Sequence, residues 1–216
     1  MLRRTLFAIT MFSVLPAIGT KELIAWLPTL LGLGAGDLVV VPELAYPTYD
    51  VGARLAGATV LSADSLTQLG PQRPALLYLN SPANPTGKVL PLDHLRKVVG
   101  WARDRGVIVA SDECYLGLAW DAEPLSVLHP DVCDGDHTGL LAVHSMSKTS
   151  SLAGYRAGFV AGDPELVAEL LAVRKHAGDD PAKQLELLRD LMPLAPLPAA
   201  PAAPAAAAPA ASGAAS

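Results

Sequence analysis

The sequence predicts an α/β fold of three layers, α/β/α, around a mostly parallel sheet. Short apolar runs typical of buried strands alternate along the chain with stretches of helical spacing, which is the pattern of parallel strands joined by helices. Apolar residues make up 51% of the 216 residues and charged residues 17%, as expected for a chain with a large core. The alternation ends before residues 193–216, whose Ala- and Pro-rich composition predicts a disordered tail.

The expected strands are continuous apolar runs, because a strand that is buried on both faces of a parallel sheet shows no polar alternation. In chain order they are a short strand at 13–15 and the runs DLVVV, ALLYL, VIVA, LLAVH and GFVA at 37–41, 75–79, 107–110, 140–144 and 158–161.

The expected helices alternate with these strands and carry apolar residues three or four positions apart. Thr20 is the predicted N-cap of a helix that runs to Leu31, and Pro164 lies where the last helix of the pattern begins. The other predicted helices cover 49–56, 92–105 and, less regularly, 185–194. The chain therefore divides into a lead segment, a folded body, a divergent stretch and the tail, at 1–12, 13–178, 179–192 and 193–216.

The N-terminal residues resemble a secretory signal in composition, since Arg3 and Arg4 precede an apolar run to Ile18. However, Pro16 interrupts the run and no cleavage site of small residues follows it. The run is also shorter than the roughly 20 residues of a membrane-spanning helix. We therefore favour a buried strand that leads into a helix, and we expect a cytoplasmic protein without a membrane segment.

Charge, cysteine and histidine patterns argue against several classes of site. The formal charge of −5 gives no reason to expect nucleic acid. Cys114 and Cys133 form no C-x-x-C, which argues against a disulfide scaffold or a zinc site, and the acidic loop around Cys133 is expected to be solvated. The five histidines lack ligand spacing, so no metal is expected. Gly32, Gly34 and Gly36 follow a helix, which predicts a helix end and a turn instead of a dinucleotide loop.

Lys148 follows the strand at 140–144 and lies among small hydroxyl residues. An aldehyde cofactor would explain this position, because a partly desolvated amine can form a Schiff base with it. Ser145 and Ser147 offer hydroxyls to a phosphate group, and Arg156 could donate two hydrogen bonds to it. Taken alone, a lysine with two serines is more often a solvated turn.

Two turns at the ends of predicted strands carry further polar residues. Asn84 lies in an N-P-T-G turn after the strand at 75–79, at the edge where ligand sites of α/β sheets form. Asp112 and Tyr115 follow the strand at 107–110. A buried aspartate there can pair with a protonated ring nitrogen and make the ring an electron acceptor.

Two more features are suited to a flat, phosphorylated cofactor. Gly19, Thr20 and Lys21 open a helix, and the free N–H groups at a helix start favour a phosphate. Tyr46 offers a flat ring that could stack on a flat cofactor.

In order and spacing, these motifs resemble those of the fold-type I pyridoxal-phosphate aminotransferases of class I/II, over residues 14–178. The resemblance implies pyridoxal 5′-phosphate as cofactor and residues 13–178 as a partial cofactor-binding large domain. It implies that Lys148 is the Schiff-base lysine and proton shuttle, that Asp112 pairs with the ring nitrogen, and that Asn84 and Tyr115 bind the ring's 3-oxygen. The remaining implied cofactor contacts are the phosphate site and the stacking ring: Gly19, Thr20, Lys21, Ser145, Arg156 and Tyr46.

Three stretches resemble the succinyldiaminopimelate transaminases of lysine biosynthesis more closely: ELAYPTYDVGARLAGA, LNSPANPTGKVLP and HSMSKTSSLAGYRAGFVAGD. This implies amino-group transfer between an amino acid and a 2-oxo acid, with N-succinyl-2,6-diaminopimelate and glutamate as substrates of a homodimer. A pyridoxal-phosphate-dependent carbon–sulfur lyase is one alternative, because the same lysine and aspartate serve β-elimination. A non-catalytic fragment is the other.

The resemblance is partial, because the family pattern stops after Gly178 and Arg189 lies in no family motif. Members of the family carry an N-terminal part of the substrate pocket and a C-terminal small domain whose arginine binds the substrate carboxylate. We therefore expect a chain truncated at both ends. Such a chain would lack an orienting contact, and orientation can be worth several kcal/mol of barrier.

Overall fold

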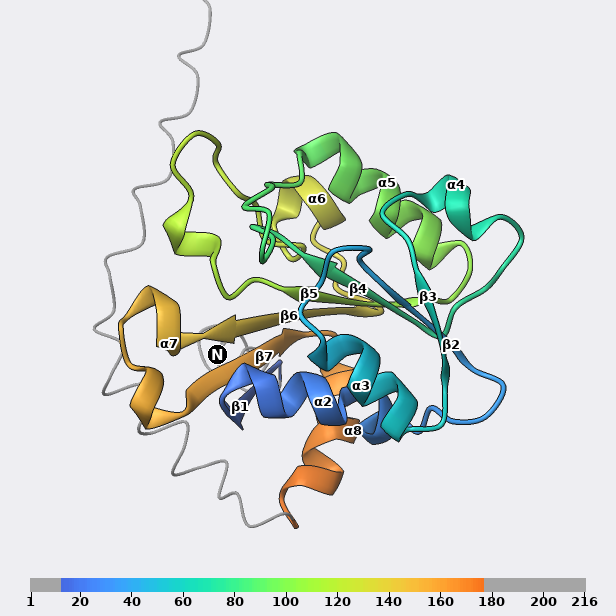
Figure 1. Cartoon of the computed structure of the whole chain (residues 1–216), viewed down its shortest axis with the longest axis horizontal. Helices are drawn as coiled ribbons and strands as arrows, with labels where there is room; N and C mark the ends of the chain where they lie inside the picture. Colours follow the sequence, from blue (N-terminus) through green and yellow to red (C-terminus); the bar gives the residue numbers. More distant parts are fainter. Residues whose placement is uncertain (1–12, 177–216) are drawn as a thin grey trace, which may run out of the picture.

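The computed structural model describes residues 13–176, and its centre is a sheet that contains seven strands within this range (Figure 1). β2 to β6 run parallel, whereas β7 is antiparallel to both β6 and β1. Of these seven strands, β7 is therefore the one that runs in the opposite direction. The order across the sheet is β1-β7-β6-β5-β4-β2-β3. The strands are β1 (Val14–Ile18), β2 (Leu38–Val41), β3 (Thr59–Ser62), β4 (Leu76–Asn80), β5 (Ile108–Asp112), β6 (Leu140–Ser145) and β7 (Ala157–Gly162).

Helices cover both faces of the sheet and complete the predicted three layers (Figure 1). One face, called the α3 face below, is covered by α2 (Thr20–Leu30), α3 (Thr48–Leu55) and α8 (Pro164–Arg174). The opposite face, called the α5 face, is covered by α4 (Leu66–Leu69), α5 (Leu92–Arg103) and α6 (Pro130–Cys133). A single helical turn, α7 (Met146–Thr149), follows β6 directly. The α/β/α fold with a mostly parallel sheet is confirmed.

The strands are apolar throughout because both faces of the sheet are buried. Neighbouring residues of a strand point to opposite faces. On β5, Ile108 and Ala110 pack into the core of the α3 face, while Val109 packs into the core of the α5 face. The same alternation directs every later residue of β5, including the polar residues at its end.

Close packing of α2 on α3 depends on one glycine. A Cβ atom on Gly52 of α3 would lie 2.6 Å from the carbonyl oxygen of Ala25 in α2, which is closer than real Cβ contacts. Any side chain at this position would push the two helices apart. On the other face, α5 is amphipathic as predicted, and its buried residues are Leu95, Val98, Val99 and Ala102.

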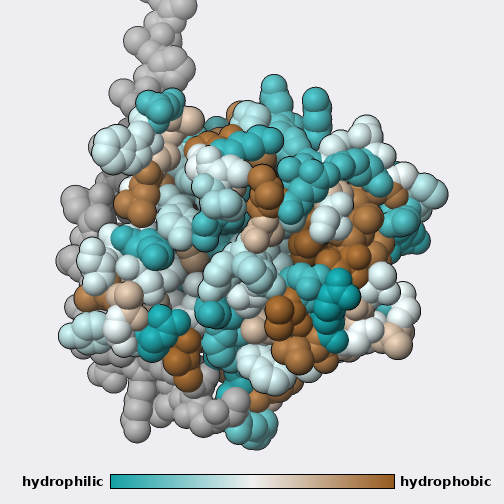
Figure 2. Space-filling model, in the orientation of Figure 1, coloured by the Kyte–Doolittle hydropathy of each residue, from teal (hydrophilic) through white to brown (hydrophobic). Residues whose placement is uncertain are grey.

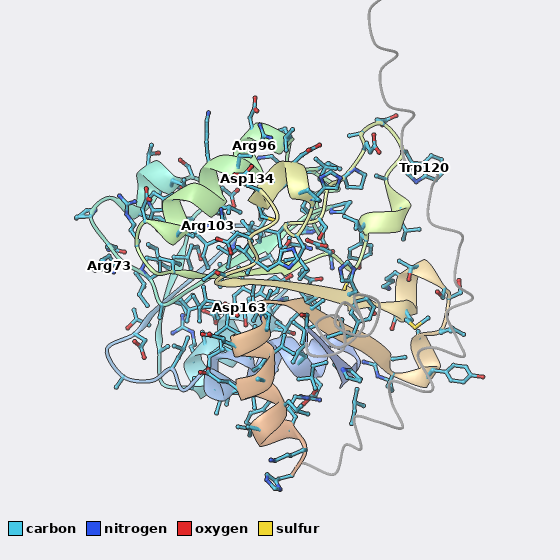
Figure 3. The ribbon with its side chains drawn as sticks, turned by 180° about the vertical axis from the view of Figure 1, so that it is seen from behind. Arg73, Arg96, Arg103, Trp120, Asp134 and Asp163 are labelled. Atoms are coloured by element: carbon cyan, nitrogen blue, oxygen red, sulfur yellow. The ribbon has the colours of Figure 1, made fainter. Side chains whose placement is uncertain are left out.

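The prediction of a solvated loop around Cys133 is wrong for the cysteine itself, whereas Asp134 and Asp136 of the loop are exposed. Pro130 starts the short helix α6, which turns Val132 and Cys133 inward while the acidic residues beside them stay exposed. Cys133 is fully buried, and the Arg103 guanidinium of α5 donates to its carbonyl oxygen at 2.9 Å. Arg103 and Asp134 lie on the same side of the sheet (Figure 3). Four residues of helix leave no periodic pattern, so their acidic neighbours were the only signal in the sequence.

Other short elements, among them β3, α4 and α7, were not predicted either. β3 lies at the edge of the sheet and contributes only two partly buried apolar residues, Val60 and Leu61, between exposed ones. α4 is a single turn, held by a capping box in which Ser65 and Gln68 each bond the other's backbone. The predicted helix at 185–194 and the segments at 1–12, 179–192 and 193–216 lie outside the described residues.

Candidate functional site

Parallel strands bring the predicted site residues to one edge of the sheet. The chain leaves β1 at Gly19, and the loops after β4, β5 and β6 carry Asn84, Tyr115 and Lys148. The antiparallel strand β7 starts at this edge, directly after Arg156. A cavity of about 320 Å³ lies there. Its lining contains all the predicted residues except Gly19: Thr20, Lys21, Tyr46, Asn84, Asp112, Tyr115, Ser145, Lys148 and Arg156.

Gly19, and not Thr20 as predicted, is the N-cap of α2, so no side chain caps this helix start. Gly19 has φ +74°, a backbone conformation that favours glycine, and a Cβ atom there would push the guanidinium of Arg156 away from the helix start. Thr20 is instead the first helical residue. The contact joins the positive end of the α2 dipole to a guanidinium, an arrangement that attracts anions.

Further positive charge lies at the same end of the cavity. The Lys21 ammonium is 5.5 Å from the centre of the Tyr46 ring. A hydrogen bond from Lys21 lowers the pKa of the Tyr46 hydroxyl, and the charge of Arg156 adds to this effect. The Ser145 hydroxyl accepts from the backbone N–H of Ser147 at 3.2 Å and also bonds the Cys114 thiol.

Asp112 lines the same cavity and is buried beside hydrogen-bond donors. Its Oδ2 accepts from the Tyr49 hydroxyl at 2.6 Å, and its Oδ1 accepts from the backbone N–H of Cys114 at 3.2 Å. Burial and the Asp112 charge raise the pKa of Tyr49, which keeps this hydroxyl protonated as a donor. Asp112 is therefore held as an acceptor that faces the cavity.

Tyr49 was missed as a site residue by sequence reasoning, which placed it only at the start of a helix. It lies three residues after Tyr46 and is almost fully buried. Its ring is tilted against that of Tyr78, with centroids 4.8 Å apart. A tyrosine with a buried hydroxyl requires a partner, but the sequence does not show that a residue 63 positions away supplies it.

Asn80 was also missed, and it holds the loop that carries Asn84. Its Oδ1 accepts from the Asn84 backbone N–H at 2.7 Å, and its Nδ2 donates to the Asp112 carbonyl at 3.0 Å. The end of β4 is thus tied both to the N-P-T-G turn and to the end of β5. A polar residue that ends the run ALLYLN was the only signal.

Lys148 extends from α7, and its ammonium lies 6.0 Å from the centre of the Tyr115 ring. The turn is fixed because the Thr149 hydroxyl donates to the Ser145 carbonyl at 3.0 Å. The sequence predicted a partly desolvated amine at Lys148. This prediction is wrong for the structure of residues 13–176, because Lys148 is exposed. Its reach towards the cavity comes from the placement of α7 at the end of β6.

Cys114 also faces this cavity and is buried. Its thiol donates to the Thr20 hydroxyl at 3.3 Å, and burial raises its pKa, so it is an inert thiol that packs α2 against β5. Among residues 13–176, no cluster of three or more histidine, cysteine or acidic side chains is suited to a metal. No helix in this range has the length and apolarity to cross a membrane.

Comparison with known proteins gives concordant results. The family model "Aminotransferase class I and II" matches residues 7–210. A probable aminotransferase of Mycobacterium tuberculosis is 84% identical over 170 residues, which are 79% of this chain and 41% of the relative. The 4-dedimethylamino-4-oxo-anhydrotetracycline transaminase of Streptomyces rimosus is 58% identical over 166 residues, 77% of this chain and 46% of the relative.

A solved structure is also similar. The probable N-succinyldiaminopimelate aminotransferase from Thermus thermophilus superposes with a TM-score of 0.68 at 30% identity, over 76% of this chain and 46% of that one. The chain therefore spans a little under half the length of these relatives.

Proposed function

This chain belongs to the class I and II aminotransferases, and from that membership we propose that the protein transfers an amino group between an amino acid and a 2-oxo acid with pyridoxal 5′-phosphate. The observation that carries the proposal is the one cavity lined by nearly all the residues that the sequence motifs assign to this cofactor. When bound, pyridoxal phosphate supplies a reactive aldehyde carbon and a ring that accepts electrons.

The lining of the cavity fits such a group. The uncapped start of α2 and Arg156 offer N–H donors to the phosphate, and Gly19 leaves the space that brings them together. Ser145 offers a hydroxyl beside them. Tyr46 offers a ring to stack on the cofactor. A single ligand that carries both a phosphate and a flat ring would explain why the cavity has cationic and aromatic lining residues.

The remaining residues would hold and move protons. Asp112 would keep the proton on the ring nitrogen, because both its oxygens act as acceptors in a buried setting. Tyr115 and Asn84 would donate to the 3-oxygen of the ring. The Lys148 amine would bind the aldehyde carbon and then carry a proton between the substrate's α-carbon and that same carbon.

We propose N-succinyl-2,6-diaminopimelate and glutamate as the substrates, in a cytoplasmic homodimer whose large domain includes residues 13–178. The name of the Thermus thermophilus relative supports this choice. The Streptomyces rimosus relative is named for a different substrate, so the choice rests on a substrate panel. Pyridoxamine formation with glutamate and turnover of the succinylated substrate would support it, whereas release of a thiol from a cysteine conjugate would favour the lyase.

The experiment that tests the cofactor assignment is reductive labelling. The chain is incubated with pyridoxal phosphate, reduced with borohydride and mapped by peptide mass spectrometry. We expect the label on Lys148, and its loss in Lys148→Ala. Lys21 lines the same cavity and Lys88 does not, so they serve as internal controls. A label that stays on Lys21 or Lys88 in Lys148→Ala, or that never reaches Lys148, overturns the assignment.

A further inference from the structure

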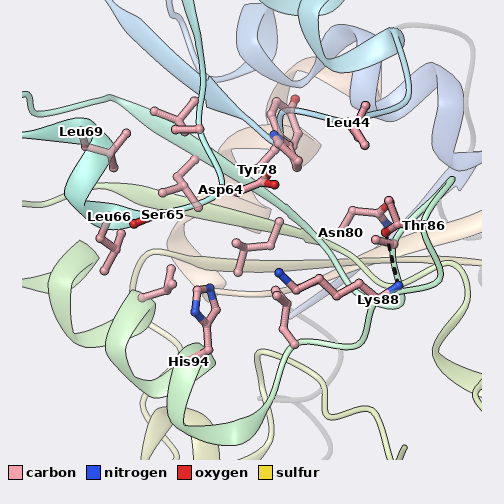
Figure 4. A pocket seen from close by; sticks show the side chains of 18 residues that line it. Leu44, Asp64, Ser65, Leu66, Leu69, Tyr78, Asn80, Thr86, Lys88 and His94 are labelled. Carbon is pink, nitrogen blue, oxygen red and sulfur yellow. Dashed lines mark hydrogen bonds between the residues drawn. The ribbon is translucent and has the colours of Figure 1, made fainter. Parts of the chain in front are cut away.

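A second cavity lies on the α5 face, lined on one side by Thr86 and Lys88 of the loop that follows β4 (Figure 4). Its volume is about 150 Å³, and its walls come from β2, β4, α4, α5 and the loops that join them. A dry cavity of this size can hold a benzene ring. Its apolar lining includes Val40, Leu66, Leu69, Leu77, Leu79 and Val98.

Two basic side chains lie next to this apolar lining. Lys88 reaches in from the loop after β4, and His94 reaches in from α5, so that both point into the same space (Figure 4). No carboxylate of residues 13–176 lies within ion-pair distance of the Lys88 ammonium. The acidic residue at the rim, Asp64, already accepts a hydrogen bond from the backbone N–H of Glu43 at 3.0 Å.

The charges around His94 show the sign of the potential at the rim. Burial lowers the pKa of its imidazole, and the positive charges of Lys88 and Lys97 lower it further. An anion at the rim would therefore meet the positive charge of Lys88, and it would also favour the protonated form of His94. The surface around the opening is rich in apolar side chains, over the region of α4 and β3 (Figure 2). An exposed example is Leu44, which is 66% exposed and lines the cavity.

We propose that this cavity binds a small carboxylate whose apolar body is about the size of one six-membered ring. The body would displace water from the Leu77 and Leu79 side chains, and the carboxylate would remain at the rim with Lys88 and His94. A neutral molecule of the same shape gains only the apolar contact. A cation of the same shape meets the Lys88 charge.

The proposed site is independent of the transaminase proposal, although the two cavities adjoin. Asn80 lines both cavities and bonds the Asn84 backbone. Ala83 and Thr86 of the same loop face the second cavity. The occupant would contact one side of this loop, and the cofactor proposed above would contact the other.

The test is an NMR titration of the 216-residue chain with benzoate, benzyl alcohol and benzylamine. We expect saturable shifts of the Leu77 and Leu79 methyl signals. We expect benzoate to bind roughly threefold to fivefold more tightly than benzyl alcohol, which is the size of a partly exposed charge contact. Benzylamine should bind more weakly than both. Ala63→Leu, which places a larger side chain in the cavity lining, should weaken all three ligands.

Matched variants locate the charge that matters. Lys88→Met should remove the preference for benzoate over benzyl alcohol. Lys97→Met removes the same charge from an exposed position of α5 outside the lining and should preserve most of the preference. Arg156→Ala removes one cation of the other cavity and should leave the benzoate preference of this one unchanged. Equal binding of benzoate and benzyl alcohol, a preference that survives Lys88→Met, or shifts that depend on Arg156 would each overturn the proposal.

Discussion

Asp112 and Glu113 are consecutive carboxylates at the end of β5, and their surroundings differ completely. Asp112 points to the α3 face, where it accepts from Tyr49 and lines the proposed cofactor cavity. Glu113 points to the α5 face and is only 1% exposed. Its Oε1 accepts from the backbone N–H of Val127 at 2.7 Å, and its Oε2 lies 3.2 Å from His144 Nε2.

The difference shows how one strand end can serve two purposes. The residues that bind Glu113 belong to a distant loop and to the neighbouring strand β6, so this carboxylate joins three segments of chain. His144 also stacks on Phe159 of β7, with ring centroids 4.9 Å apart. Asp112 instead has its partners on the side of the cavity. We therefore expect changes at Glu113 to affect stability and changes around Asp112 to affect the ligand.

The largest expected effect on stability is that of Glu113→Ala. The change leaves the buried Val127 N–H without its acceptor and removes the contact between Glu113 and His144. We expect the free energy of unfolding to fall by about 3 kcal/mol. Urea unfolding of the cofactor-free chain measures it. Glu113→Gln keeps the acceptor for Val127 and should recover part of the loss; an unchanged midpoint in Glu113→Ala would show that the pair is not structural.

The next largest effect is expected at the proposed cofactor cavity, on the binding of pyridoxal phosphate. Arg156→Ala should weaken binding of pyridoxal phosphate roughly 30-fold, because hydrogen bonds to a charged group are worth about 1.5–3 kcal/mol. The unfolding midpoint of the cofactor-free chain should change little, since Arg156 is exposed. Absorbance titration measures the affinity. Arg156→Lys should be intermediate, because a lysine keeps the charge but not the two-pronged donor. Equal affinity in all three proteins would remove Arg156 from the phosphate site.

A smaller effect distinguishes Tyr49, which lines the proposed cofactor cavity, from Tyr78, whose ring packs against it. Tyr49→Phe removes a donor from buried Asp112 and should cost about 1–2 kcal/mol of unfolding free energy. Tyr78→Phe removes a similar bond, from its hydroxyl to the Ile24 carbonyl at 3.1 Å, and is the matched control. Only Tyr49→Phe should alter the visible spectrum of the bound cofactor. A spectral change in both variants would mean that the effect passes through packing and not through Asp112.

The same two regions show what sequence could and could not predict. The ends of the strands could be predicted because each apolar run stops at a polar residue. Since parallel strands end at the same edge of a sheet, these local patterns also predicted that Asn84, Asp112 and Lys148 lie close together. The partners Tyr49 and Asn80 act through contacts that join elements distant in sequence. No local pattern encodes such contacts, and for the same reason the sequence left Glu113 without a role.

The smallest effect is the pH dependence of stability at the second cavity. The pKa of His94 is lowered from 6.5 by burial, Lys88 and Lys97, so the unfolded chain takes up a proton at this residue more readily than the folded chain. Its contribution to stability is therefore present above pH 6.5 and is lost as the pH falls below that value. Between about pH 8 and about pH 5.5, the wild-type chain should lose more unfolding free energy than His94→Gln, measured by urea unfolding at each pH.

Lys88→Met should reduce the same loss, because it removes one of the two cations. His176, which is exposed, is the matched control, and His176→Gln should follow the wild type. Identical pH dependence in the wild type and His94→Gln would show that the rim of this cavity carries no excess positive potential, and would leave a carboxylate no reason to prefer it.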